Sequence, residues 1–197
     1  MTLSHRIGAL AQLTFQDPRR AARVLLAEDV PLRARTAGLL LVAVVSALLA
    51  SLQVGAGLQE LDPFSAFMLA SPFRAAIMQW LFMALSVVLI HRVGGAFGGR
   101  GSFADAMLVV VWLQLLMLAL QILQLVATFV APPLAGIIGI IGLGVFFWLI
   151  TTFIAELHGF ASRGLVFLGI VLTCIGTGIV LGILLILILG PEAFQNV

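Results

Sequence analysis

The 197-residue sequence contains no lysine, no tyrosine, one cysteine and few charged residues. Only 9% of its residues are charged, whereas a soluble domain carries about 25%. So few charges cannot cover the surface of a soluble protein, and a soluble globular domain is therefore excluded. The single cysteine, Cys174, excludes an intrachain disulfide. The lack of lysine excludes Schiff-base chemistry and the lysine-dependent phosphate loop.

Hydrophobic residues make up 62% of the chain, and the mean hydropathy is +1.24. A helix needs about 20 apolar residues to cross a bilayer, and the prolines at 132 and 133 divide one apolar stretch that is too long for a single crossing. We predict an all-α polytopic membrane protein, a bundle of five transmembrane helices preceded by an amphipathic interfacial helical segment. The predicted parts are a leader (1–35), a membrane domain (36–190) with spans at 36–54, 74–93, 105–131, 134–155 and 164–189, and a tail (191–197).

All ten basic residues are arginine, and their distribution predicts the orientation. Short cytoplasmic loops are enriched in arginine. Arg74 alone lies on one side of the predicted spans, whereas the other side has nine: Arg6, Arg19, Arg20, Arg23, Arg33, Arg35, Arg92, Arg100 and Arg163. The N-terminus is therefore predicted to be cytoplasmic and the C-terminus on the opposite side. The arginine-only, Ala- and Gly-rich composition suggests a GC-rich bacterial genome, and hence the bacterial inner membrane.

The leader contains a predicted basic amphipathic helix. Asp17-Pro18 is a typical helix start. Leu25 and Leu26 share one side of the following helix with two alanines, while Arg19, Arg20 and Arg23 lie across from them. Such a helix is typical of an interfacial anchor on anionic headgroups, at about 1 kcal/mol per arginine; docking of a protein partner is the less favoured alternative. A second interfacial segment is predicted at 58–72 on the far side.

Span three has a predicted polar stripe on one face, formed by Gln114, Gln121, Gln124 and Thr128. Amides facing lipid would have no partners, so the stripe should face the bundle. Hydrogen bonding between helices is the favoured interpretation, and a wall for a solute or lipid headgroup is the alternative. Small residues, including Cys174, Gly178 and Gly182 on span five, predict close helix packing, more within the chain than in a dimer.

The remaining ionisable residues gather at the cytoplasmic ends of the spans. His91, Glu156 and His158 could be metal ligands by residue type, but their spacing fits no known metal motif, so helix caps and ion pairs are favoured. The glycine-rich segment 94–102 lacks the lysine and hydroxyl of a phosphate loop. We therefore predict no catalytic residue, metal or cofactor, and no nucleic-acid partner.

Four short motifs resemble the Yip1-domain family as found in bacteria. They occur in order along the chain, at residues 17–18, 71–74, 97–103 and 156–160. The resemblance implies five spans, a cytoplasmic N-terminus and no catalytic residues. Eukaryotic members bind prenylated Rab-type GTPases in vesicle traffic, but this chain has only Asp29-Val30-Pro31 where they have Asp-Leu-Tyr-Gly-Pro. GTPase binding is therefore not carried over.

Two functional hypotheses follow. The first is a non-enzymatic scaffold that recruits partners through its cytoplasmic face. The second is a conduit for lipid or a small solute along the polar stripe. The expected partners are anionic lipid headgroups, and a protein or a second copy of the chain. The candidate interaction surface consists of Arg19, Arg20, Arg23, Arg100, His158 and Arg163.

Overall fold

The computed structural model describes residues 3–55 and 63–189, and every regular element in these ranges is an α-helix. Five of the helices are long and apolar enough to cross a membrane. They coincide with the five predicted spans to within a few residues, which confirms the all-α polytopic fold. The helices are α1 (Leu3–Gln16), α2 (Pro18–Leu26), α3 (Leu32–Gly55), α4 (Pro63–Leu69), α5 (Pro72–Ala96), α6 (Phe103–Val130), α7 (Pro132–His158) and α8 (Arg163–Leu189).

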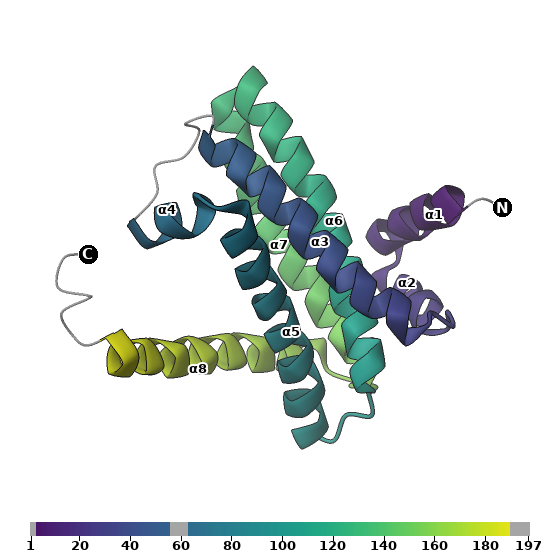
Figure 1. The fold of residues 1–197 in the computed structure, drawn as a ribbon. Helices are drawn as coiled ribbons and strands as arrows, with labels where there is room; N and C mark the ends of the chain where they lie inside the picture. The colour runs from purple at the N-terminus through teal and green to yellow at the C-terminus, as the bar shows by residue number, and fades with distance from the viewer. Residues whose placement is uncertain (1–2, 56–62, 190–197) are drawn as a thin grey trace.

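Four of the long helices, α3, α5, α6 and α7, pack into one bundle (Figure 1). Helix α6 contacts each of the other three. Its buried side chains, such as Leu113, pack in one core with Met83 of α5 and with Leu149 and Phe153 of α7. These side chains are apolar, as expected for helices that bury one face against their neighbours.

Proline and glycine set the helix boundaries. Pro72 and Pro132 stand at the first turns of α5 and α7, where a missing backbone N–H costs nothing. The predicted break between spans three and four is confirmed, because α6 ends at Val130 and α7 begins at Pro132. Gly159 ends α7 with φ of +74°, a left-handed conformation that glycine adopts without strain.

Helix α8 contacts α7 and then leads away from the bundle (Figure 1). The prediction that its small residues pack within the chain is wrong for Gly178 and Gly182, because a Cβ added at either would meet nothing within 4 Å. Cys174 is exposed as well. Close packing occurs instead between α6 and α7, where a Cβ at Gly142 would contact Leu120.

The bundle has two ends that differ in character. We call the end that holds α2 and the turns at 97–102 and 159–162 the proximal end, and the end at the α6–α7 turn the distal end. Helix α4, part of the predicted interfacial segment 58–72, lies toward the distal end (Figure 1). Residues 58–62 of that predicted segment, and the predicted tail 191–197, lie outside the described residues.

Candidate functional site

The leader packs onto the proximal end of the bundle. The Asp17 carboxylate caps α2 by accepting a hydrogen bond from the Arg20 backbone N–H at 3.0 Å. The apolar side of α2, including Ala22 and Leu25, is buried in the core against α6 and α7. This apolar side therefore faces protein, although the amphipathic pattern alone favoured lipid.

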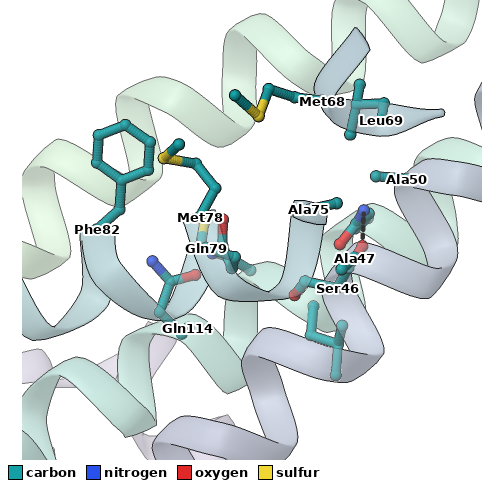
Figure 2. A pocket seen from close by; sticks show the side chains of 13 residues that line it. Ser46, Ala47, Ala50, Met68, Leu69, Ala75, Met78, Gln79, Phe82 and Gln114 are labelled. Carbon is teal, nitrogen blue, oxygen red and sulfur yellow. Dashed lines mark hydrogen bonds between the residues drawn. The ribbon is translucent and has the colours of Figure 1, made fainter. Parts of the chain in front are cut away.

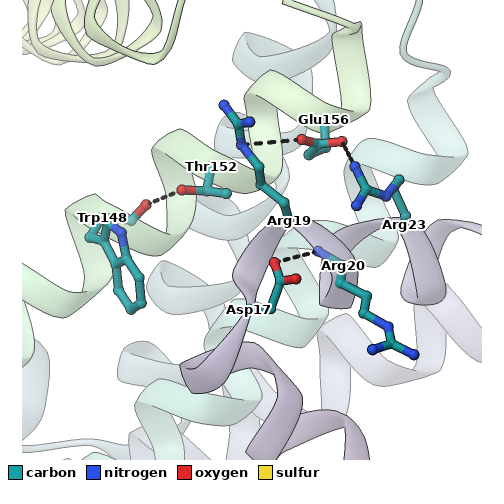
Figure 3. Close-up of polar contacts among 7 residues, drawn as sticks. All are labelled: Asp17, Arg19, Arg20, Arg23, Trp148, Thr152 and Glu156. Carbon is teal, nitrogen blue, oxygen red and sulfur yellow. Dashed lines mark hydrogen bonds and ion pairs between the residues drawn. The ribbon is translucent and has the colours of Figure 1, made fainter.

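Glu156 near the end of α7 attaches two of the leader arginines. Its carboxylate oxygens lie 3.6 Å from Arg19 Nε and 3.3 Å from Arg23 Nη1 (Figure 3). Figure 3 shows that the Arg20 side chain points away from this pair. Arg19 and Arg23, both predicted to form an interaction surface, are thus engaged within the chain, and Arg20 is available.

A second, more buried ion pair links the start of α3 to the start of α6. Arg35 Nη1 lies 2.9 Å from Asp105 Oδ1, and Arg35 Nε donates to the Val30 carbonyl at 2.8 Å. Arg35 is only 9% exposed. Ser102 accepts from the Asp105 backbone N–H and donates to its carboxylate, so this side chain both caps α6 and positions the acid.

The turn between α5 and α6 closes around His158. The His158 Nδ1 accepts from the Gly101 N–H at 3.2 Å, and its Nε2 lies 3.0 Å from the Ile90 carbonyl. Since a backbone N–H can only donate and a carbonyl can only accept, these two contacts require neutral imidazole with the hydrogen on Nε2. The Arg100 N–H donates to the His158 carbonyl at 3.3 Å. We call this arrangement the histidine clamp.

Glycines make room for the histidine clamp. A Cβ at Gly94 or Gly99 would collide with the His158 ring, and one at Gly101 would contact Leu157 Cγ at 2.7 Å. His158 is only 3% exposed, so its placement on the exposed interaction surface is wrong. The signal in the sequence was the glycine-rich segment 94–101, whose glycines admit a ring instead of a phosphate.

Three arginines of the predicted surface are exposed at the proximal end. Arg20, Arg100 and Arg163 lie on α2, on the α5–α6 turn and at the start of α8. None of the three forms an ion pair within the residues that the structure describes. Their charges are therefore open to a ligand, whereas those of Arg19 and Arg23 are partly neutralised.

The predicted polar stripe of α6 divides into two parts. Gln124 Nε2 donates to the Ala135 carbonyl of α7 at 3.4 Å, and Thr128 Oγ1 donates to the Gln124 carbonyl at 2.8 Å. Gln121 Nε2 donates to the Ser46 carbonyl of α3 at 3.2 Å. Gln114 makes no hydrogen bond within the described residues and faces a cavity instead.

This cavity, which we call the polar hollow, lies among α3, α4, α5 and α6 toward the distal end. Its volume is about 240 Å³ (Figure 2). Gln79 of α5 contributes a third amide beside Gln114 and Gln121. The role of Gln79 was not predictable from the sequence, because the contact between α5 and α6 cannot be read from either helix alone.

A match to a known protein family decides which family the chain belongs to. The sequence model of the Yip1 domain matches residues 13–187. The chain belongs to the Yip1 family. This match and the five apolar helices identify a multi-pass membrane protein. No curated protein and no solved structure matches the chain.

The Yip1 match includes both the histidine clamp and the polar hollow, because it runs from the end of α1 to near the end of α8. The four motifs that carried the resemblance also lie inside it. One of them, at 97–103, forms the α5–α6 turn, and another, at 156–160, supplies Glu156 and His158. Both motifs therefore serve packing at the proximal end of the Yip1 domain.

The metal interpretation of His91, Glu156 and His158 does not fit their contacts. Glu156 pairs with arginines, His158 is held by backbone groups, and His91 Nδ1 lies 3.1 Å from the Gly101 carbonyl. Among residues 3–55 and 63–189, no group of three or more His, Cys, Asp and Glu side chains could hold a metal ion.

Proposed function

We propose that this Yip1 family protein is a non-enzymatic scaffold that recruits a protein partner through its proximal face. The supporting observation is the exposure of Arg20, Arg100 and Arg163 without an acidic partner in the described part of the chain. A fixed backbone beneath these arginines favours a specific contact, because the chain then loses less conformational entropy on binding. The histidine clamp supplies such a backbone at Arg100.

The chemistry of the face indicates an acidic partner segment. Arginine binds carboxylates through two parallel hydrogen bonds. Anionic lipid headgroups use the same charges, and binding of lipid by Arg20 would orient the leader at the membrane surface. The distribution of nine arginines to one side assigns this face to the cytoplasm in our proposal.

The conduit hypothesis has less support. Gln114 and Gln121 face the polar hollow, but Gln124 bonds to α7. One turn nearer the proximal end, Met83 and Val110 are buried, so apolar side chains fill the path that a solute would take. We therefore favour the scaffold.

Proximity labelling in living cells tests the proposal. A labelling enzyme is fused to the N-terminus of the full chain, and the wild type is compared with the triple variant Arg20→Gln, Arg100→Gln and Arg163→Gln. We expect the wild type to enrich a discrete set of proteins and the triple variant to lose it.

The variant Arg74→Gln is the control, because it removes an arginine from α5 near its distal end. It should preserve the labelled set. Identical labelling by the wild type and the triple variant, at equal expression, would overturn the proposal and leave lipid binding as the role of the three arginines.

A further inference from the structure

Two amide side chains face the polar hollow without partners. Gln79 of α5 and Gln114 of α6 line it, and neither forms a hydrogen bond within the described residues. Figure 2 shows these two side chains on one side of the hollow, with Met68 and Leu69 of α4 on another. By contrast, the Gln121 amide donates one hydrogen bond, to the Ser46 carbonyl.

An amide without partners is unfavourable in a membrane protein. Moving such a group from water to an apolar environment without a hydrogen bond costs about 2–7 kcal/mol. Each amide has two N–H donors and a carbonyl acceptor. Gln79 and Gln114 are half-buried, so their amides are accessible to a bound group that both donates and accepts hydrogen bonds, as a hydroxyl does and a carboxylate does not.

The remaining walls restrict the chemistry of this group. None of the described residues that line the hollow is ionisable, so a charged ligand would lose its hydration without gaining a counter-ion. Met68, Met78 and Met117 provide apolar contact for the carbon atoms of a ligand. Together these features fit an uncharged polyol with alternating hydroxyl and CH surfaces.

The apolar core and helix α4 lie on two sides of the hollow. One helical turn nearer the proximal end than Gln79 and Gln114, Met83 and Val110 are buried in the apolar core. The α4 wall is held to its neighbours by Ser51 Oγ, which donates to the Leu69 carbonyl at 3.3 Å, and by Arg74, whose Cζ lies 3.9 Å from the centre of the Phe67 ring. Apolar core side chains therefore lie between the hollow and the proximal end of the bundle.

We propose that the polar hollow binds an uncharged polyol group through Gln79 and Gln114. The same hydroxyl chemistry can come from a free polyol or from the headgroup of a glycolipid. This inference is independent of partner recruitment at the proximal face, because the two sites share no residue.

Native mass spectrometry of the full-length protein in detergent micelles tests the proposal. The lipid probe is monoglucosyl diacylglycerol, and the matched lipid is triacylglycerol, which has no hydroxyl group. We expect the protein to retain the glucosyl lipid and not the triacylglycerol. Gln79→Leu and Gln114→Leu should each weaken retention about tenfold, as the loss of one hydrogen-bonding side chain predicts. The two variants are independent, so either one that folds suffices.

The control is Gln124→Leu, the same substitution on α6 but outside the hollow. It should leave retention unchanged. Displacement of the lipid by free methyl glucoside would show that the sugar alone is the ligand, and failure to displace it would identify the lipid-borne headgroup as the source. Equal retention of both lipids, no retention, or unchanged retention in the hollow variants would overturn the proposal and indicate a hollow that holds water only.

Discussion

At the scale of single residues, His158 is the side chain that organises the proximal end. Its ring joins the α5 carbonyl of Ile90 to the N–H of Gly101, and it stacks on Phe160 with ring centres 5.4 Å apart. The space it occupies exists because Gly94 and Gly99 have no side chains. A three-way contact of this kind connects two helices and a turn through one buried group.

Adding a methyl group beside this ring should destabilise the protein. We expect Gly94→Ala to lower the free energy of unfolding by about 1–3 kcal/mol, because the new Cβ would overlap the buried His158 ring. The measurement is the thermal unfolding midpoint of the purified protein in detergent.

Gly95→Ala is the matched control. A Cβ at this neighbouring position of α5 meets nothing within 4 Å, and alanine favours a helix by about 0.5–1 kcal/mol over glycine. It should therefore preserve or raise the midpoint. Equal loss in both variants would contradict the role of Gly94 in the clamp.

The role of His158 was not predictable from its own position. In the sequence it follows an apolar span and precedes a glycine, a context that suits an exposed helix end. Its burial depends on glycines about 60 residues earlier in the chain, and no local pattern reports such a distant contact. Asp17, in contrast, caps α2 as predicted, because capping is decided within one helical turn.

At the scale of elements, the leader and α8 show what hydrophobic patterns do and do not predict. Apolar length was sufficient to find all five spanning helices. It could not decide what each apolar face contacts, since lipid and protein are equally apolar neighbours. As a result, α2 packs on the bundle through Ala22 and Leu25, whereas Gly178 of α8 has no neighbour within reach.

Two substitutions compare how much a buried and an exposed ion pair at the proximal end contribute to stability. Asp105→Asn should lower the unfolding free energy by about 1–3 kcal/mol, because it leaves the guanidinium of the buried Arg35 without its charged partner. Glu156→Gln should cost less, about 0.2–1 kcal/mol, because Arg19 and Arg23 are exposed.

Amide hydrogen exchange of α2 provides a second measurement for these two substitutions. Glu156→Gln should speed amide exchange in residues 18–26 while the rest of the bundle stays protected, because α2 loses two ion pairs with α7. A larger stability loss from Glu156→Gln than from Asp105→Asn would contradict the assignment of Arg35–Asp105 as the stronger attachment.

At the scale of the whole molecule, arginine is distributed unequally between the two ends. Arg74 is near the distal end of α5, while the other nine lie in the leader, in the α5–α6 turn, or at the proximal ends of α3, α5 and α8. This distribution was evident in the sequence, because it depends only on where the spans begin and end. The polar hollow was not, because it requires α3, α4, α5 and α6 to meet.

The orientation predicted from the arginines can be tested with single cysteines. In a Cys174→Ala background, Ala70→Cys should react with a membrane-impermeant maleimide in intact spheroplasts. Ser162→Cys should react only after permeabilisation, because it lies in the proximal turn between α7 and α8. Both positions are exposed in the structure. The reverse labelling pattern would show that the proximal face is not cytoplasmic.

Site-specific photo-crosslinking tests whether the proximal face contacts a protein, as we propose. A photoreactive amino acid replaces Arg100 in the α5–α6 turn, and in a control it replaces Ile140, an exposed residue in the distal half of α7. After illumination of native membranes, we expect a discrete protein adduct at position 100 and only lipid adducts at position 140. Lipid adducts alone at both positions, or the same protein adduct at both, would rule out the proposed scaffold role of the proximal face.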